Sequence, residues 1–196
     1  LGDVYKRQLQ GGFIWDFVDQ ALHRKAQDGT DLWLYGTDFE KEEPRHWYSL
    51  PNTTAITGSN TYFCANGIIG ADRTVHPQYY EVQKVYAPVQ TLAVNPDSGS
   101  FTVKNKMLFT NINALECRWQ IEVGGRLLMH GKLEPIDCPP LSEVTVSLPY
   151  TMDQVTGDGM AVLTVSFATT RALPGLASGF TFAWDQFVLR PMPQPV

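Results

Sequence analysis

The stretch Gly11–Gln20, GGFIWDFVDQ, decides how the first half of the chain is to be interpreted. It is a short apolar and aromatic run that opens with two glycines, and this pattern predicts a strand over residues 12–18. Nearly continuous apolarity favours a strand that is buried on both faces, as in a parallel sheet. Side chains alternate along a strand, so the expected faces are Phe13, Trp15, Phe17 and Asp19 on one side and Ile14, Asp16 and Val18 on the other.

The two acids of this stretch, Asp16 and Asp19, are three positions apart and therefore point to opposite faces of a strand. They cannot form the facing pair of carboxylates that cleaves a glycosidic bond, so we expect both to be buried and hydrogen-bonded to loop amides. Trp15 would lie at the carboxyl end of the strand, where barrel enzymes build their active sites, and its ring could stack on a sugar. The residues alone favour the simpler interpretation, in which Trp15 packs in a core.

The segment after this stretch contains turns, a long loop and one helix. Asp28-Gly29 predicts a turn, and the polar residues 40–61 predict a long loop. Asn66 precedes a glycine, which indicates a turn, although its carboxamide could also bind a hard cation or a substrate hydroxyl. The residues alone favour the turn. A helix is predicted from Pro77, which suits a first helical position, up to Pro88, which ends it.

The second half of the chain is rich in predicted strands. In CRWQIEV apolar residues alternate with polar ones from Cys117 to Val123, and the following Gly124-Gly125 predicts a two-residue hairpin turn. The apolar positions change parity between Trp184 and Phe187, which predicts a bulge. Seven short strands of this kind are typical of an immunoglobulin-like sandwich. The candidates are residues 89–94, 101–109, 117–123, 126–133, 144–148, 160–168 and 179–190.

Composition and charge exclude several classes of function. Hydrophobic residues make up 43% of the 196 residues and charged residues 18%, as expected for a folded globular chain. The formal net charge of −5 argues against a nucleic-acid or anionic-membrane partner, and no apolar run approaches the roughly 20 residues of a membrane span. Three widely spaced cysteines, Cys64, Cys117 and Cys138, are expected to be free thiols, because they fit neither a disulfide framework nor a CxxC metal site.

The chain is expected to contain parts of two domains. Residues 9–87 offer one strand, one helix and a loop, which cannot bury a core alone and are expected to be the end of something larger. Residues 88–191 could fold by themselves, and residues 192–196 are expected to form a linker. Residues 1–8, LGDVYKRQ, resemble translated adaptor sequence and are excluded from the fold argument, so the natural start is expected upstream.

Five motifs follow one another in an order that resembles family 2 glycoside hydrolases of the β-galactosidase type. They are GGFIWDFVDQ, the Asp28-Gly29 pair, YGTDF, YFCANGI and ADRTVHPQYYEVQKVY. The second half continues the resemblance with FTNINALECRWQIEVGGRLLMHGKLEP and GFTFAWDQF, which are similar to the immunoglobulin-like domain after the barrel in that family. The resemblance spans residues 9–191. It implies an α/β barrel remnant, the last strand and helix of a TIM barrel, followed by an all-β immunoglobulin-like sandwich.

The resemblance implies roles for three residues in the galactose pocket of a retaining glycosidase. The family's counterpart of Trp15 lines that pocket. The counterpart of Phe63 gives a backbone carbonyl to a sodium ion, and the counterpart of Asn66 contacts both this sodium and a substrate hydroxyl. These roles raise the sugar-binding interpretation of Trp15 and Asn66 above core packing and a simple turn.

The resemblance also implies that the chain lacks most of the catalytic machinery. The nucleophile and acid/base glutamates belong to earlier barrel strands, as do the primary magnesium ligands of the parent enzyme. The loop over residues 40–61 is longer than in well-known members, so a second magnesium site could match Ser59 or Asn60, and neither is assigned. The isolated chain is therefore expected to be inactive, whereas the parent would hydrolyse terminal non-reducing β-D-galactosides.

Two alternatives stay open at this point. The first is another family 2 specificity, β-glucuronidase or β-mannosidase, although the Asn-x-Lys signature of glucuronidases does not occur in this sequence. The second is a non-catalytic carbohydrate-binding or spacer module. Many family members are oligomers, so a homo-oligomeric parent is an expectation, as is a cytoplasmic or periplasmic bacterial location.

Overall fold

The computed structural model describes residues 11–35 and 65–192. These residues form two compact units, which divide between Val82 and Gln83 and are described separately below. No helix within the described ranges is long and apolar enough to cross a membrane. Several predicted features lie outside the described residues: residues 1–8, the loop 40–61, Ser59, Asn60, Phe63, Cys64 and most of the linker 192–196.

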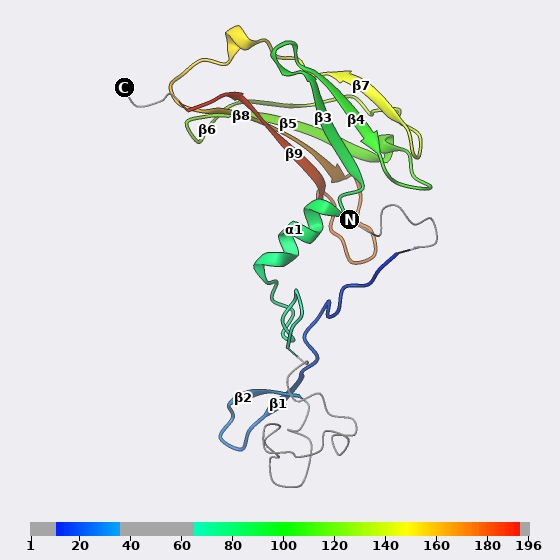
Figure 1. Ribbon diagram of the computed structural model, residues 1–196, viewed down its shortest axis with the longest axis vertical. Helices are drawn as coiled ribbons and strands as arrows, with labels where there is room; N and C mark the ends of the chain where they lie inside the picture. Colours follow the sequence, from blue (N-terminus) through cyan, green and yellow to red (C-terminus); the bar gives the residue numbers. More distant parts are fainter. Residues whose placement is uncertain (1–10, 36–64, 193–196) are drawn as a thin grey trace. The chain divides into compact units, whose positions relative to one another are not determined.

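In the N-terminal unit, strands β1 (Leu22–Lys25) and β2 (Asp31–Leu34) form an antiparallel hairpin (Figure 1). The turn predicted from Asp28-Gly29 is confirmed between them. Gly29 has a φ of 86°, which favours glycine, and the Thr30 amide donates to the Asp28 carboxylate at 2.9 Å. The turn therefore fixes β2 beside β1 and places Trp33, the aromatic residue of β2, opposite His23.

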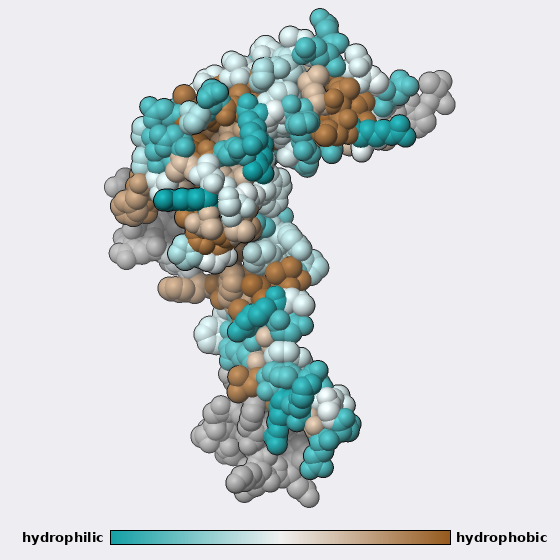
Figure 2. Space-filling view, turned by 180° about the vertical axis from the view of Figure 1, so that it is seen from behind, coloured by the Kyte–Doolittle hydropathy of each residue, from teal (hydrophilic) through white to brown (hydrophobic). Residues whose placement is uncertain are grey.

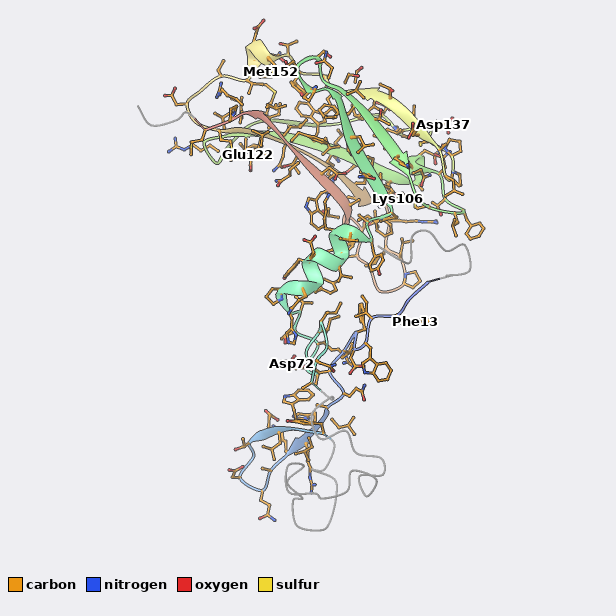
Figure 3. The ribbon with its side chains drawn as sticks, viewed as in Figure 1. Phe13, Asp72, Lys106, Glu122, Asp137 and Met152 are labelled. Carbon is orange, nitrogen blue, oxygen red and sulfur yellow. The ribbon has the colours of Figure 1, made fainter. Side chains whose placement is uncertain are left out.

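The strand predicted over residues 12–18 is not formed, and this prediction is wrong. Val18 makes an isolated parallel bridge with Ile69. The predicted burial of the aromatic residues is wrong as well, since they are exposed. The exposed aromatic side chains are Phe13, which is labelled in Figure 3, Trp15 and Phe17. A strand needs neighbours to pair its backbone, and the described residues pair this segment only through a short contact around the Val18–Ile69 bridge.

Helix α1 (Pro77–Val85) begins at the predicted proline and ends before Pro88, which confirms the predicted helix. Lys84 lies in its last turn, where a cation interacts favourably with the helix dipole. The helix has no buried residue, and the side chain of Tyr80 is 56% exposed. An apolar helical residue of this kind normally packs against other elements, so α1 lacks part of its packing among the described residues.

The second unit contains two antiparallel sheets (Figure 1). One has three strands in the order β3-β4-β7, and the other has four in the order β6-β5-β8-β9. The strands are β3 (Val89–Asn95), β4 (Ser100–Asn105), β5 (Leu115–Val123), β6 (Arg126–Lys132), β7 (Glu143–Ser147), β8 (Ala161–Thr169) and β9 (Thr181–Arg190). Each lies on a predicted segment, so all seven predicted strands are confirmed. Three short 3-10 helices lie in the connections: Pro96–Ser98, Ile112–Ala114 and Met152–Gln154.

The hydrophobic core of this unit lies between the two sheets. Alternate residues of β5 are buried from Leu115 to Val123, which confirms the predicted alternation. Phe101 of β4 is fully buried and contacts the ring of Phe187 in the opposite sheet, with 4.9 Å between ring centroids. The Gly124-Gly125 turn is also confirmed, because both residues have the positive φ that such a hairpin requires. The unit therefore has a core of its own.

The bulge predicted between Trp184 and Phe187 is wrongly placed. The pairing of β8 with β9 is regular there and shifts register nearer the strand ends, where Phe182 and Leu189 are the extra residues. The apolar pattern misled because an acid, Asp185, occupies an inward-facing position of β9. Its carboxylate binds Lys84 and the Thr91 amide there. A polar residue at an inward-facing position therefore interrupts the apolar alternation of a strand without a bulge.

Hydrophobic surface is spread over the molecule. On the face seen in Figure 2, brown hydrophobic areas are separated by teal hydrophilic ones. Scattered apolar side chains are normal at protein surfaces, so no single docking face stands out in this view. The exposed hydrophobic residues of the second unit include Leu108, Phe109, Leu127, Val188 and Met192.

Candidate functional site

Two segments of the N-terminal unit, one from each side of the long loop, run side by side in the parallel direction. Three backbone hydrogen bonds of 2.9, 3.1 and 3.3 Å and the Val18–Ile69 bridge join them. Trp15 and Asn66, the two residues predicted to bind substrate, are 51 positions apart and lie three residues before Val18 and Ile69, one on each segment.

The segment that carries Asn66 is held by specific contacts. The amide of Gly67 donates to Asp19 Oδ1 at 2.7 Å, and the Gly67 carbonyl accepts a hydrogen bond from Nδ1 of His76 at 2.9 Å. A Cβ atom on Gly67 would lie 2.5 Å from the Asp19 nitrogen, so only glycine fits here. The hydrogen bond predicted between Asp19 and a loop amide is confirmed, although Asp19 is only half-buried.

Asp16 has a structural role of a different kind. It is 6% exposed, and its carboxylate accepts a hydrogen bond from Nε2 of Gln20 at 2.9 Å. The predicted burial is confirmed, and this partner is a side-chain amide of the same segment. Burial with a hydrogen-bonded partner is what a carboxylate in a folded segment requires.

Trp15 is 74% exposed, so the described residues do not pack it in a core. The peptide bond between Trp15 and Asp16 is cis. Asn66 is exposed as well. The role of Trp15 as a sugar-pocket wall, of Asn66 as a sodium and substrate ligand, and of Phe63 as a sodium ligand outside the described residues all stay predictions.

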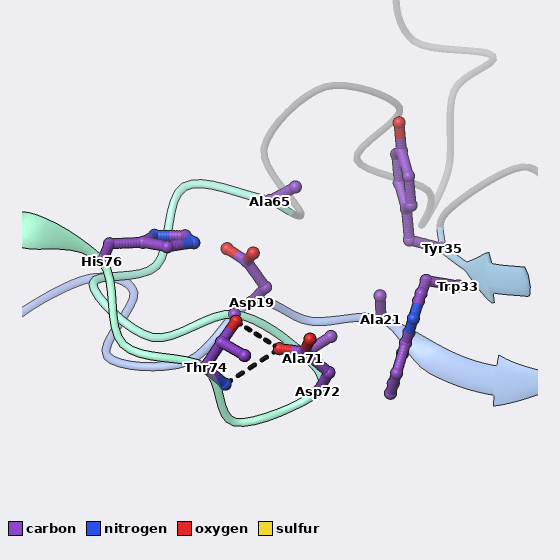
Figure 4. A pocket seen from close by; sticks show the side chains of 10 residues that line it. Asp19, Ala21, Trp33, Tyr35, Ala65, Ala71, Asp72, Thr74 and His76 are labelled. Atoms are coloured by element: carbon purple, nitrogen blue, oxygen red, sulfur yellow. Dashed lines mark hydrogen bonds between the residues drawn. The ribbon is translucent and has the colours of Figure 1, made fainter.

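An open hollow of ≈ 280 Å³ lies in the same unit. Figure 4 shows the rings of Trp33 and Tyr35 on one side of it and the side chains of Asp19 and His76 across from them. Its aromatic and polar lining residues are Asp19, Trp33, Tyr35, Asp72, Thr74 and His76. Sequence reasoning missed Trp33 and Tyr35 as site residues. The available signal was the presence of two aromatic residues shortly after the predicted Asp28-Gly29 turn.

Asp72 is the acid of this hollow whose electrostatics are best defined. Its Oδ1 accepts hydrogen bonds from Oγ1 of Thr74 at 2.6 Å and from the Thr74 amide at 2.9 Å. These two bonds lower the pKa of Asp72 from its ordinary value, since both favour the charged form. The hollow therefore contains a carboxylate that stays ionised at neutral pH.

Within the ranges 11–35 and 65–192, no three His, Cys, Asp or Glu side chains are grouped so as to hold a metal ion. Asn66 offers an amide oxygen, and hard cations bind neutral oxygen ligands of this kind. The described side chains therefore do not test the predicted binding of sodium and magnesium.

Two family models match the chain in succession. A model described as "Glycosyl hydrolases family 2, TIM barrel domain" matches residues 2–91, and one described as "Beta-galactosidase, domain 4" matches residues 101–190. The first covers the unit with the Val18–Ile69 bridge and α1, and the second covers most of the two-sheet unit.

Curated relatives with the name β-galactosidase are similar to nearly the whole chain. The protein from Priestia megaterium is 39% identical over 183 residues, which are 92% of this chain and 16% of the relative. The protein from Clostridium acetobutylicum is 34% identical over 190 residues, 97% of this chain and 19% of the relative. The protein from Yersinia enterocolitica is 32% identical over 182 residues, 93% of this chain and 16% of the relative. The chain thus spans less than a fifth of the length of these relatives.

Proposed function

Because the chain belongs to glycosyl hydrolase family 2, of the β-galactosidase type, we propose that it is part of a retaining β-galactosidase. Residues 9–87 would be the end of the catalytic TIM barrel, and residues 88–191 the immunoglobulin-like domain after it. The similarity along both parts, at 39% identity over 183 residues, carries this proposal. The three-plus-four arrangement of strands supports the immunoglobulin-like assignment.

The parent enzyme would hydrolyse terminal non-reducing β-D-galactosides by double displacement. One carboxylic acid would protonate the leaving oxygen, and a second carboxylate would form the glycosyl-enzyme, which water then hydrolyses. Both glutamates would come from earlier barrel strands. In this chain, Asp16 and Asp19 are engaged by Gln20 and Gly67, which suits structural roles rather than acid–base roles.

The contribution of this chain would be to position the galactose. Trp15 and Asn66 lie on two segments that the Val18–Ile69 bridge joins, so an aromatic face and a carboxamide would approach the sugar from adjoining segments. Asp19 and His76 form hydrogen bonds with the backbone of Gly67, the residue after Asn66. These bonds would hold the Asn66 carboxamide in place. Orientation of this kind supplies a sizeable share of the barrier reduction in enzymes.

Asn66 and the backbone carbonyl of Phe63 would hold a sodium ion, and magnesium would bind in the parent through ligands that lie upstream. Asn66 is exposed, and the next residue, Gly67, is held by Asp19. Such an amide suits a hard cation, because these ions take neutral oxygen ligands. The sodium would supply a fixed positive charge that orients a galactose hydroxyl. A homo-oligomeric parent also remains a proposal.

The purified 196-residue chain tests one half of this proposal: it should not hydrolyse nitrophenyl β-galactoside, because both catalytic carboxylates would be upstream. Measurable turnover by this chain would contradict that assignment. The complete protein tests the other half and should prefer the β-galactoside to the matching β-glucuronide and β-mannoside. A reversed preference would favour the other family 2 specificities.

Calorimetry distinguishes the proposed enzyme from the alternative of a non-catalytic module. Galactose should bind the complete protein more tightly in sodium than in potassium salt, and should not bind residues 88–191 alone. Those residues have their own core, so they can be studied separately. Galactose binding by residues 88–191 would favour a carbohydrate-binding module instead.

A further inference from the structure

We propose that the hollow lined by Trp33, Tyr35 and Asp72 is a second carbohydrate-binding site, which takes one pyranose ring. It is separate from the galactose site proposed at Trp15 and Asn66, since neither residue lines the hollow. The proposal depends on the chemistry of the hollow and not on the β-galactosidase activity of the parent.

The aromatic side of the hollow is a platform of two rings. Trp33 lies in β2 and Tyr35 directly follows the last residue of this strand, and Figure 4 shows both rings on the same side of the hollow, extending away from each other. Trp33 is 40% exposed and Tyr35 is 38% exposed, which leaves part of each ring accessible. The C–H face of a pyranose is the flat apolar surface that packs on such rings.

The Trp33 ring of the platform is held in place before any ligand arrives. Trp33 is paired with His23 across the hairpin, and their ring centroids are 5.1 Å apart. Nε2 of His23 is in turn 2.6 Å from Oδ1 of Asp31, which also accepts from Lys25 Nζ at 2.9 Å. A ring that is already ordered loses less conformational entropy on binding.

The opposite side of the hollow presents hydrogen-bond acceptors. Asp19 and Asp72 are oriented by their bonds to the Gly67 amide and to Thr74. Because the Gly67 carbonyl can only accept, Nδ1 of His76 carries the hydrogen of that bond. Acceptors facing an aromatic platform match a molecule that has many hydroxyl donors and one apolar face.

Size and charge narrow the ligand class. A volume of ≈ 280 Å³ lies just below the range of about 300–1,000 Å³ for sites that hold drug-sized molecules, so one sugar ring fits better than an oligosaccharide. Two carboxylates disfavour phosphorylated or acidic sugars. The site therefore suits a neutral monosaccharide or the neutral terminal ring of a longer glycan.

The tryptophan indoles of the chain make the test specific. The 196-residue chain, labelled with ¹⁵N, would be titrated with methyl β-D-galactopyranoside, methyl β-D-glucopyranoside and, separately, tetramethylammonium chloride. We expect the Trp33 indole and the Gly70 and Asp72 amides to shift saturably with at least one sugar. Trp119 and Trp184 lie in the other unit and serve as internal controls.

Variants separate this site from the proposed galactose site. Trp33→Ala should weaken sugar binding about tenfold, as read from the Gly70 and Asp72 amides, whereas Tyr35→Phe keeps the ring and should retain binding. Trp15→Ala should leave the Trp33 response unchanged. A response of Trp15 alone would leave the proposed galactose site standing and overturn this one.

Three other results would also overturn the second site. They are an unchanged Trp33 signal with every sugar, a Trp33 shift no larger than that of Trp184, and a saturable shift with tetramethylammonium alone. The last result would assign the rings and carboxylates to a cation, which the same groups can attract.

Discussion

The amide of Gly67 donates a hydrogen bond to Oδ1 of Asp19 at 2.7 Å, across 48 residues of sequence. This bond fastens the turn after the long loop to the segment that carries Trp15. The approach of the two backbones is too close for any side chain at Gly67, because a Cβ atom would lie 2.5 Å from the Asp19 nitrogen. The position of Asn66, the residue before Gly67, relative to that segment depends on this contact.

Gly67→Ala should therefore loosen residues 65–76. Forcing a methyl group into a filled space costs about 1–3 kcal/mol, which corresponds to about 10- to 100-fold faster amide exchange. Gly12→Ala is the matched control, because a Cβ there meets no atom within 4 Å. Hydrogen exchange of the full chain, read by mass spectrometry over residues 65–76, measures the difference. Equal exchange in the two variants would show that the contact does not hold the turn.

Asp185 joins the edges of the two sheets. Its Oδ2 accepts from the Thr91 amide at 2.6 Å, and its Oδ1 pairs with Lys84 Nζ at 2.5 Å. Asp185→Ala should lower the free energy of unfolding of the second unit by about 1–3 kcal/mol, because the buried Thr91 amide loses its acceptor. Urea denaturation of the full chain, followed by circular dichroism, measures this loss. The control is Asp158→Ala at an exposed position, which should hardly change the free energy of unfolding. An equal loss of stability in this control would contradict the role given to Asp185.

Glu116 should make stability depend on pH. Its carboxylate lies 2.6 Å from Lys132 Nζ and 2.5 Å from Arg118 Nε, and these partners lower the pKa of Glu116 from its ordinary value of 4.5. A lowered folded-state pKa stabilises the fold above pH 4.5, and the stabilisation is lost as pH falls through the folded-state pKa.

Glu116→Gln should accordingly cost less than about 1 kcal/mol at pH 7, since the partners are exposed, and less again at pH 3 or in high salt. Urea midpoints at pH 7 and pH 3 measure the change, with Glu122→Gln as control. A cost that grows toward acid pH would contradict the assignment of these ion pairs.

The two described cysteines should resist alkylation in the folded chain. Cys117 and Cys138 are free and buried, and burial raises the pKa of the Cys117 thiol to about 12. Alkylation requires the thiolate, so iodoacetamide at pH 8.5 should modify both residues only after unfolding. Mass spectrometry of native and urea-treated chain, in a Cys64→Ser background, gives the answer. Rapid native modification of Cys117 would show that its strand opens readily.

The second unit could be predicted from sequence because its signals are local. Alternation from Cys117 to Val123 and the Gly124-Gly125 turn each lie within a few residues, and both were confirmed. The bulge was misplaced because Asp185 sits inward through bonds to distant partners. Such partners cannot be seen in an apolar pattern.

The N-terminal unit could be predicted only in part. The turn at Asp28-Gly29, the helix and the bond of Asp19 to a loop amide were confirmed, because turn and helix signals are local. The strand over residues 12–18 was wrong because a strand depends on neighbours that the described residues do not supply. The hollow beside Trp33 was missed because its walls are brought together from segments far apart in sequence.

The most direct test of the proposed function is the effect of Trp15→Ala in the complete protein that contains this chain. We predict that kcat/KM for nitrophenyl β-galactoside falls by about 100-fold, because the sugar loses one wall of its pocket and is held less well. The melting temperature should hardly change, since Trp15 is largely exposed among the residues described here. A loss of activity only in proportion to a loss of folded protein would contradict this account and make Trp15 a core residue.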